Sequence, residues 1–166
     1  SDVGVVIEAK RPSNKGEFIS TKSLNKKALQ ELLLYYLRER VDYKNNNIKQ
    51  LVITNGFEWF FFKAEDFYEL FYKNKKLIKE YEQFRDKLKD TSKNELFYNE
   101  IAYKYIEEVK HLLPFVYLDF RSKSVSQLND KEIVIIYKLF SDVHLLGKSF
   151  GNDSNRLNKE FYNELL

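Results

Sequence analysis

A glutamate and a lysine stand two positions apart near the start of the chain, in the segment 5–10 (VVIEAK). Because side chains alternate between the two faces of a β-strand, we expect Glu8 and Lys10 on one face, with Ala9 buried behind them. A carboxylate oxygen is the kind of ligand that Mg²⁺ binds. Such a metal polarises a phosphate and lowers the pKa of an attacking water, while an ammonium group beside it stabilises developing negative charge. This spacing therefore indicates metal-dependent hydrolysis of a phosphodiester.

The same two residues have a plainer interpretation. Glu-x-Lys triplets are common on exposed strand edges, where the two side chains are solvated or form a weak ion pair. The triplet here follows a run of apolar residues, which favours a buried strand. The residues alone leave both interpretations open.

The elements that must position this pair are a strand and a long helix. The strand is expected over 3–10 and ends at Arg11 and Pro12, since proline cannot donate to a sheet. A polar loop over 13–21 follows. A helix is expected over 23–40, with Ser23 or Asn25 as its cap, because apolar side chains recur at steps of three and four residues: Leu29, Leu32, Leu33, Tyr36 and Leu37.

A β-hairpin should follow the helix. Asn55-Gly56 separates two β-rich runs, 51–54 and 57–62, and both of these turn residues tolerate a positive φ. The second run is almost entirely aromatic, which indicates a strand packed on both faces rather than a platform for stacking bases.

The rest of the chain is expected to be mainly helical. Helical patterns begin near residue 65 and return over 130–146, with a short strand possible over 115–120. We therefore expect an α/β fold with a restriction-endonuclease-like core over 1–64, namely a short mixed sheet and a flanking helix. A helical extension over 65–166 belongs to the same compact unit.

Composition bounds the class of protein. The 166 residues suit one domain, and a net charge of +3 means that nucleic acid would have to bind to local basic patches. Cysteine is absent, which excludes disulfides and thiolate metal sites. No signal peptide or membrane span is visible, so a cytoplasmic protein is expected. Because the chain starts at Ser1 and contains no methionine, we expect it to be part of a longer polypeptide.

Several segments in order resemble a known family. VVIEAKRPSN resembles the second half of the PD-(D/E)xK nuclease motif. NKKALQELLLYYLRER, LVITNGFEWFFF and FGNDSNRLNKEFYNELL look like the amino-terminal region of type IIG restriction-modification enzymes. In those proteins a nuclease domain precedes an adenine-specific DNA methyltransferase and a target-recognition domain. The resemblance covers nearly the whole chain.

The resemblance implies a type II restriction endonuclease domain that cuts duplex DNA with Mg²⁺. Glu8 takes the position of the acidic motif residue, Lys10 that of the lysine, and the Ala9 carbonyl would lie near the metal. S-adenosylmethionine would bind only to the methyltransferase part, which this chain lacks. Arg11 and Lys15 are candidates for contacts with the DNA backbone.

Two of the family's features match this sequence incompletely. Its first metal-binding aspartate lies further upstream than Asp2, which is only six residues before Glu8. The family also has a glutamine and a tyrosine, four residues apart, on the helix that follows. Gln30 and Tyr35 are the right residue types but stand five apart, whereas Glu31 and Tyr35 have the four-residue spacing with a glutamate in place of the glutamine. Gln30 is the candidate for a supporting role at the site. The alternative is that it belongs to the polar surface of the helix. The alternative function is a non-catalytic DNA-docking or scaffold module with a nuclease-like fold.

Overall fold

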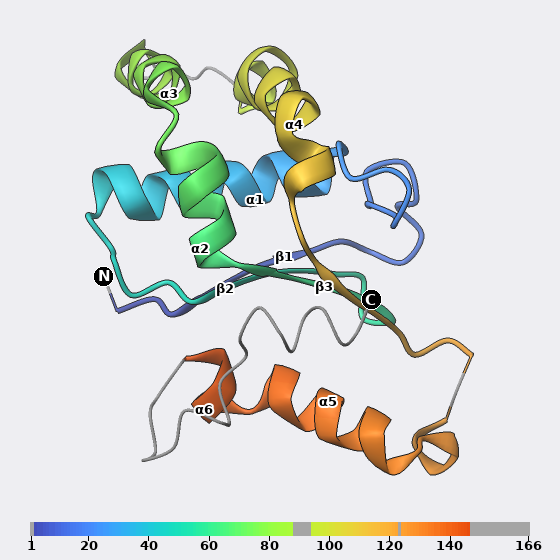
Figure 1. Ribbon diagram of the computed structural model, residues 1–166. Helices are drawn as coiled ribbons and strands as arrows, with labels where there is room; N and C mark the ends of the chain where they lie inside the picture. Colours follow the sequence, from blue (N-terminus) through green and yellow to red (C-terminus); the bar gives the residue numbers. More distant parts are fainter. Residues whose placement is uncertain (1, 88–93, 123, 147–166) are drawn as a thin grey trace.

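The computed structural model describes residues 2–87, 94–122 and 124–146. Within these residues, a four-stranded mixed sheet forms the centre of the molecule, with strands in the order β1 (Val5–Ala9), β2 (Gln50–Thr54), β3 (Glu58–Lys63) and β4 (Val116–Asp119). β1 and β2 are parallel, and the two later pairs are antiparallel. The expected α/β class with a short mixed sheet is confirmed (Figure 1).

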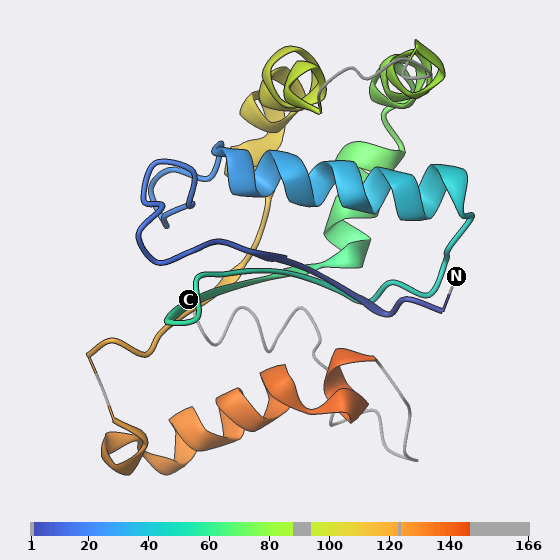
Figure 2. The same ribbon diagram turned by 180° about the vertical axis from the view of Figure 1, so that it is seen from behind.

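Helix α1 (Lys27–Leu37) connects β1 to β2 and runs along one face of the sheet (Figures 1 and 2). Parallel neighbours need such a crossover, because a tight hairpin would make them antiparallel. Apart from the partly buried Tyr35, its apolar side chains are at most 1% exposed, since the sheet lies on one side and further helices lie on the other. The fully buried ones are Ala28, Leu29, Leu32, Leu33, Leu34, Tyr36 and Leu37.

The helix starts later than expected. Lys26 is the N-cap residue and makes no side-chain cap. The predicted caps are engaged elsewhere: Ser23 pairs with Ser20 through their backbones, and the Asn25 amide donates to the backbone of Tyr103 and to Glu107. Tertiary contacts have therefore replaced local capping. Beyond Leu37 the chain continues as a short π-helical segment, Arg38–Asp42.

The helices between β3 and β4 lie on the α1 side of the sheet (Figure 1). They are α2 (Ala64–Phe67), the π-helical segment Tyr68–Tyr72, α3 (Lys75–Lys87), the π-helical segment Phe97–Ala102, α4 (Tyr103–Val109) and the 3-10 turn Lys110–Leu112. Their buried side chains join those of β1, β2 and α1 in one hydrophobic core. β4, which comes after these helices, then completes the sheet. Residues 2–64 therefore share one hydrophobic core and one sheet with the helices and the strand that follow them, up to Asp119.

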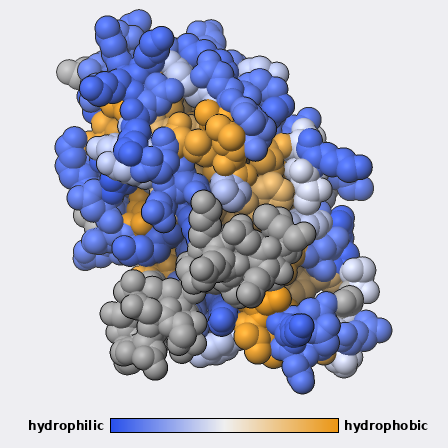
Figure 3. Space-filling view, viewed as in Figure 1, coloured by the Kyte–Doolittle hydropathy of each residue, from blue (hydrophilic) through white to orange (hydrophobic). Residues whose placement is uncertain are grey.

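The opposite face of the sheet is covered by α5 (Asp130–Phe140) and α6 (Asp142–Leu145), after a 3-10 turn at Val125–Gln127. The ring of Phe140 lies 4.9 Å from that of Trp59 and 5.5 Å from that of Phe61. The single helix expected over 130–146 is broken at Ser141, which is extended. Figure 3 shows hydrophobic surface in the lower part of the molecule, where Figure 1 places α5. On α5, Val134 and Tyr137 are exposed. The segment FGNDSNRLNKEFYNELL (150–166), one of those that resemble type IIG enzymes, lies outside the described residues.

The predicted hairpin is confirmed, although its turn differs in detail. β2 and β3 pair antiparallel from Gln50–Lys63 to Thr54–Trp59. Gly56 has a φ of +90°, whereas Asn55 stays at negative φ. The Asn55 side chain instead accepts hydrogen bonds from two backbone N–H groups of the turn, at Phe57 and Glu58. In the part of the chain that the structure describes, no helix is both long and apolar enough to cross a membrane.

Candidate functional site

Glu8 and Lys10 lie on the face of β1 that α1 covers, as predicted. Along β1 the buried residues are Val6 and Glu8, and the exposed ones are Ile7 and Ala9. The expectation that Ala9 is buried behind the pair is wrong, because its face of β1 is open to solvent at that position. The pair itself projects into the space between the sheet and α1.

Three carboxylates surround the ammonium group of Lys10. Its Nζ lies 3.3 Å from Oε1 of Glu8 and 3.2 Å from Oε2 of Glu17, and it also forms an ion pair with Glu31. The side chains of Glu8, Lys10 and Glu31 are only 10–12% exposed, whereas that of Glu17 is 34% exposed. These four residues form what we call the Lys10 cluster. It is buried at its base and opens to solvent at Glu17.

Two elements bring the glutamates to Lys10. Glu31 belongs to a row of polar residues on α1, Lys27, Glu31 and Tyr35, which follow one another at four-residue steps and therefore lie on one side of the helix. Glu17 comes from the loop between β1 and α1. Its backbone carbonyl accepts a hydrogen bond from the backbone N–H of Ala28, and the next residue, Phe18, is buried.

The carboxyl groups of Glu8 and Glu31 share this small volume. Burial raises the pKa of Glu8 to about 7, with further contributions from the negative charge of Glu31 and from a hydrogen bond between the two side chains. Burial also acts to lower the pKa of Lys10, but its hydrogen bonds to Glu31 and Glu17 outweigh this and raise it. The lysine therefore stays charged while Glu8 titrates near neutral pH.

Other residues expected at the site lie in different surroundings. Gln30 is buried and its amide donates to Asn25 rather than to the cluster, so the neighbouring Glu31 takes the place expected for it. Arg11 and Lys15 are exposed on the loop after β1. Asp2 is exposed before the strand begins.

The backbone of Ala9 faces the open edge of the sheet. In a parallel pair, alternate residues direct both their N–H and C=O groups to the neighbouring strand. Lys10 donates to Thr54, and Gly4 accepts from Lys49, so the even-numbered residues of β1 face β2. The carbonyl of Ala9 therefore points to the outer edge, which no strand in the described ranges covers.

Sequence reasoning missed two members of the cluster. The signal for Glu31 is its four-residue spacing from Tyr35 on a helix that follows the Glu-x-Lys strand. No comparable signal marks Glu17, because its position depends on how the loop packs against α1.

The ligands that the cluster could offer to a metal are two buried carboxylates. Among residues 2–87, 94–122 and 124–146, no group of three or more acidic, histidine or cysteine side chains is arranged to hold a metal ion. Mg²⁺ is commonly bound by only one or two carboxylates, with waters and substrate phosphates as its remaining ligands. Glu8 and Glu31 fit that smaller requirement.

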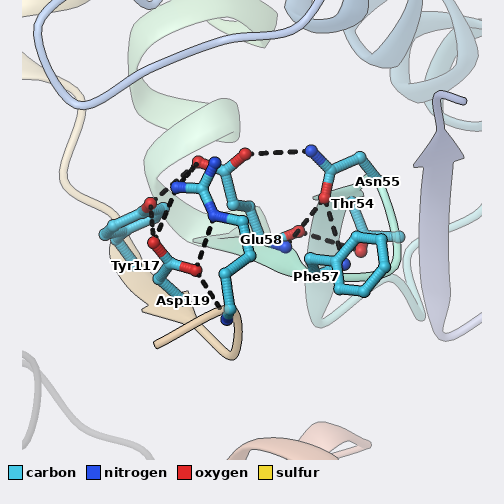
Figure 4. Close-up of polar contacts among 7 residues, drawn as sticks. Thr54, Asn55, Phe57, Glu58, Tyr117 and Asp119 are labelled. Carbon is cyan, nitrogen blue, oxygen red and sulfur yellow. Dashed lines mark hydrogen bonds and ion pairs between the residues drawn. The ribbon is translucent and has the colours of Figure 1, made fainter. Parts of the chain in front are cut away.

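A second polar network lies at the same end of the same face of the sheet, on β3 and β4 (Figure 4). Glu58 accepts hydrogen bonds from Tyr117 at 2.8 Å and from Asn55 at 2.9 Å. Arg121 bridges Glu58 at 3.1 Å and Asp119 at 2.7 Å. We call these five residues the Glu58 network. Hydrogen bonds from Arg121 lower the pKa of Asp119 to about 2, so both the guanidinium and this carboxylate stay charged.

A family model described as a domain of unknown function (DUF7149) matches residues 1–153 of the chain. The chain belongs to the DUF7149 family. The matched range contains the whole sheet, α1 and every member of the Lys10 cluster. No curated protein and no solved structure matches the chain.

Proposed function

We propose that this DUF7149 domain is a metal-dependent endonuclease domain that hydrolyses phosphodiester bonds of duplex DNA. The observation that carries the proposal is the Lys10 cluster. It puts a carboxyl group with a pKa of about 7 and a charged ammonium next to each other on one strand, with a second carboxyl from α1. Perturbed titratable groups of this kind concentrate at catalytic sites.

Each residue has a distinct part in the proposed reaction. Glu8 and Glu31 would hold Mg²⁺, together with the Ala9 carbonyl at the open edge of β1. The metal, when bound, supplies positive charge to the phosphate and acidifies the attacking water. Lys10, released from its carboxylate partners, would orient that water or stabilise charge on the phosphate oxygens. Arg11 and Lys15, exposed on the adjoining loop, would contact neighbouring phosphates.

The sequence resemblance supports the same reaction and extends it. If the domain is the amino-terminal part of a type IIG restriction-modification enzyme, its partners are the methyltransferase and target-recognition domains of the same polypeptide. S-adenosylmethionine would then serve that methyltransferase, and duplex DNA in the cytoplasm would be the substrate. The Glu-x-Lys pair at the end of β1, with α1 and β2 following it, supports this proposal, and the recognition sequence would be read elsewhere.

The test is cleavage of plasmid DNA by the longest natural polypeptide that carries this domain, with Mg²⁺ and after its removal by a chelator. The variants are Glu8→Gln and Lys10→Met, which keep the size of each side chain. We expect each variant to lose roughly 100-fold or more in cleavage rate, as when one charge-stabilising group is removed from an active site. Chelation should abolish cleavage by the unaltered protein.

Glu107→Gln provides the control, because Glu107 lies outside the cluster and pairs with Lys110 on the surface. Its cleavage rate should match that of the unaltered protein. Cleavage at the normal rate by either cluster variant, with unfolding temperatures unchanged, would remove the proposed site.

One observation favours a second function, a DNA-docking or scaffold module without catalysis. Lys10 is held by three carboxylates and is only 10% exposed, an arrangement that could simply stabilise the packing of α1 on the sheet. Under this alternative, Glu8→Gln and Lys10→Met alter the stability of the domain while the full-length protein continues to cut DNA. Comparing cleavage with thermal unfolding for the same variants separates the two.

A further inference from the structure

Glu17 holds a position that differs from that of the other two glutamates in the Lys10 cluster. Its carboxylate is the solvent-accessible member, 34% exposed, and it lies between two ammonium groups. Oε2 is 3.2 Å from Nζ of Lys10, and Oε1 is 3.4 Å from Nζ of Lys27. The amide of Asn14 donates to Oε2 at 2.8 Å. Three donors therefore converge on a single anionic group at the mouth of the cluster.

A phosphate can take the place of the Glu17 carboxylate between these donors. Both groups are anions that accept hydrogen bonds through two oxygens, and the tetrahedral shape of a phosphodiester also lets it bridge separated cations. Lysine ammonium groups are common phosphate ligands because they are compact point charges. Here one ammonium comes from Lys10, directly after β1, whose backbone N–H donates to Thr54 of β2, and the other comes from the first turn of α1, so the backbones of both residues are held by regular structure.

The Glu17 side chain can leave this position without disturbing the fold. Its backbone carbonyl is fixed by the N–H of Ala28 at 3.0 Å, and the following residues, Phe18 and Ile19, are 8% and 2% exposed. The main chain is therefore anchored on both the helix and the core. Rotation about the side-chain bonds is enough to move the carboxylate into solvent, since that side chain is already one-third exposed.

The flanking loop carries cations that can extend the contact. Arg11 and Lys15 are exposed on either side of a tight turn, in which the N–H of Asn14 donates to the carbonyl of Arg11 at 2.9 Å. DNA presents regularly spaced phosphates, so a phosphate at the position of the Glu17 carboxylate would bring its neighbours toward this turn. Lys27 keeps a second partner in Glu95, at 2.6 Å.

We propose that the position between Lys10, Lys27 and Asn14 is a binding site for a DNA phosphate, and that Glu17 fills it as an internal competitor until DNA displaces it. Glu17 thereby regulates access to Lys10. The choice of DNA as the ligand rests on the proposed function. The site itself rests on the donors that surround the Glu17 carboxylate.

The experiment measures affinity for a short duplex oligonucleotide by fluorescence anisotropy, using the full chain in the presence of a chelator so that no cleavage occurs. Glu17→Gln removes the competing charge. We expect it to bind DNA roughly 3- to 10-fold more tightly than the unaltered protein, a gain of the size expected for one well-placed charge. Glu69→Gln is the matched control, because Glu69 also pairs with a lysine, Lys73, at 2.8 Å, and its loss changes the net charge equally.

A second variant locates the gain. In the Glu17→Gln background, Lys27→Met should abolish the increase in affinity and reduce the salt dependence of binding by about one phosphate contact. Inorganic phosphate should compete with DNA for the Glu17→Gln variant more strongly than for the unaltered protein. Thermal unfolding of each variant confirms that it is folded.

Three results would overturn the proposal: equal affinities for Glu17→Gln and Glu69→Gln, a gain that survives Lys27→Met, or no competition by inorganic phosphate. These outcomes are independent of catalysis. A protein that binds DNA as described but does not cut it would contradict the proposed nuclease and leave the phosphate site standing. A protein that cuts DNA while Glu17→Gln has no effect would do the reverse.

Discussion

Two polar clusters occupy the same end of the same face of the sheet, yet their charges are balanced to different degrees. In the Lys10 cluster three carboxylates share one ammonium, and two of the carboxyl groups contact each other. In the Glu58 network two carboxylates share a guanidinium, a tyrosine hydroxyl and an amide. Both clusters have more carboxylates than cations, but the excess is larger in the first, whereas the carboxylate oxygens of the second accept hydrogen bonds or ion pairs from within the network. A larger excess of buried negative charge favours a cation, so the comparison separates a candidate site from a structural clamp.

The two clusters also respond to pH in opposite directions. The pKa of Glu8 is raised to about 7, chiefly by burial, so the cluster around it is destabilised as the pH rises. The pKa of Asp119 is lowered to about 2, chiefly by hydrogen bonds from Arg121, so that network weakens only in strong acid. The difference follows from the donors available at each position, because both clusters lie at the edge of the same core.

The largest expected difference between the clusters is in DNA cleavage by the full-length polypeptide. Glu31→Gln should lower the cleavage rate by roughly 10- to 100-fold, as loss of a group that supports a metal site commonly does. Glu58→Gln, the matched change in the other network, should leave the rate within about threefold, since Glu58 lies outside the proposed site and touches none of the Lys10 cluster. Equal rates for the two variants would remove the distinction between site and clamp.

The pH dependence of stability should come from Glu8. Its folded-state pKa is raised from 4.5 to about 7, so its stabilising contribution is full below about pH 4.5 and is lost as the pH rises through 7. Glu8→Gln should therefore flatten the decline in unfolding free energy, a difference on the order of 1–3 kcal/mol by about pH 8. Urea unfolding at a series of pH values measures it. Parallel curves for the variant and the unaltered protein would show that Glu8 does not titrate as described.

The smallest effect is expected at the rim of the Glu58 network. The side chain of Arg121 is 55% exposed, and exposed ion pairs contribute about 0–1 kcal/mol to stability. Arg121→Ala should accordingly lower the unfolding free energy only slightly, with the loss reduced further in high salt. A loss of several kcal/mol in chemical denaturation would mean that the network, rather than the hydrophobic core, holds β3 and β4 together.

Local patterns in the sequence predicted the strands, α1 and the hairpin, because each depends on residues that are close along the chain. Asn55-Gly56 specified the turn, and the aromatic run after it became a strand whose Phe60, Phe61 and Phe62 are at most 1% exposed. The start of α1 and the break at Ser141 were not predictable in this way. Asn25 is engaged by Tyr103 and Glu107, which are about eighty positions distant in sequence.

The candidate site was predictable to a similar degree. The period of a β-strand was enough to put Glu8 and Lys10 on one face, and the structure confirms it. The partners of Lys10 were beyond such reasoning, since Glu17 and Glu31 meet it only after the loop and α1 have packed on the sheet. The sequence argument chose Gln30 where the packed helix presents Glu31. One residue on a helix is a rotation of about 100°, which is enough to turn a side chain away from a site.

The outer edge of β1 has a consequence for the chemistry beside it. The N–H and C=O groups of Val5, Ile7 and Ala9 face this edge, and no strand in the described part of the chain lies beside it. An extended segment that added there would lie about 5 Å away, with every second side chain on the face of Glu8. An acidic residue on such a segment would place a third carboxylate beside those of Glu8 and Glu31. Recruitment of one short peptide strand would thus add a ligand to the site proposed for Mg²⁺.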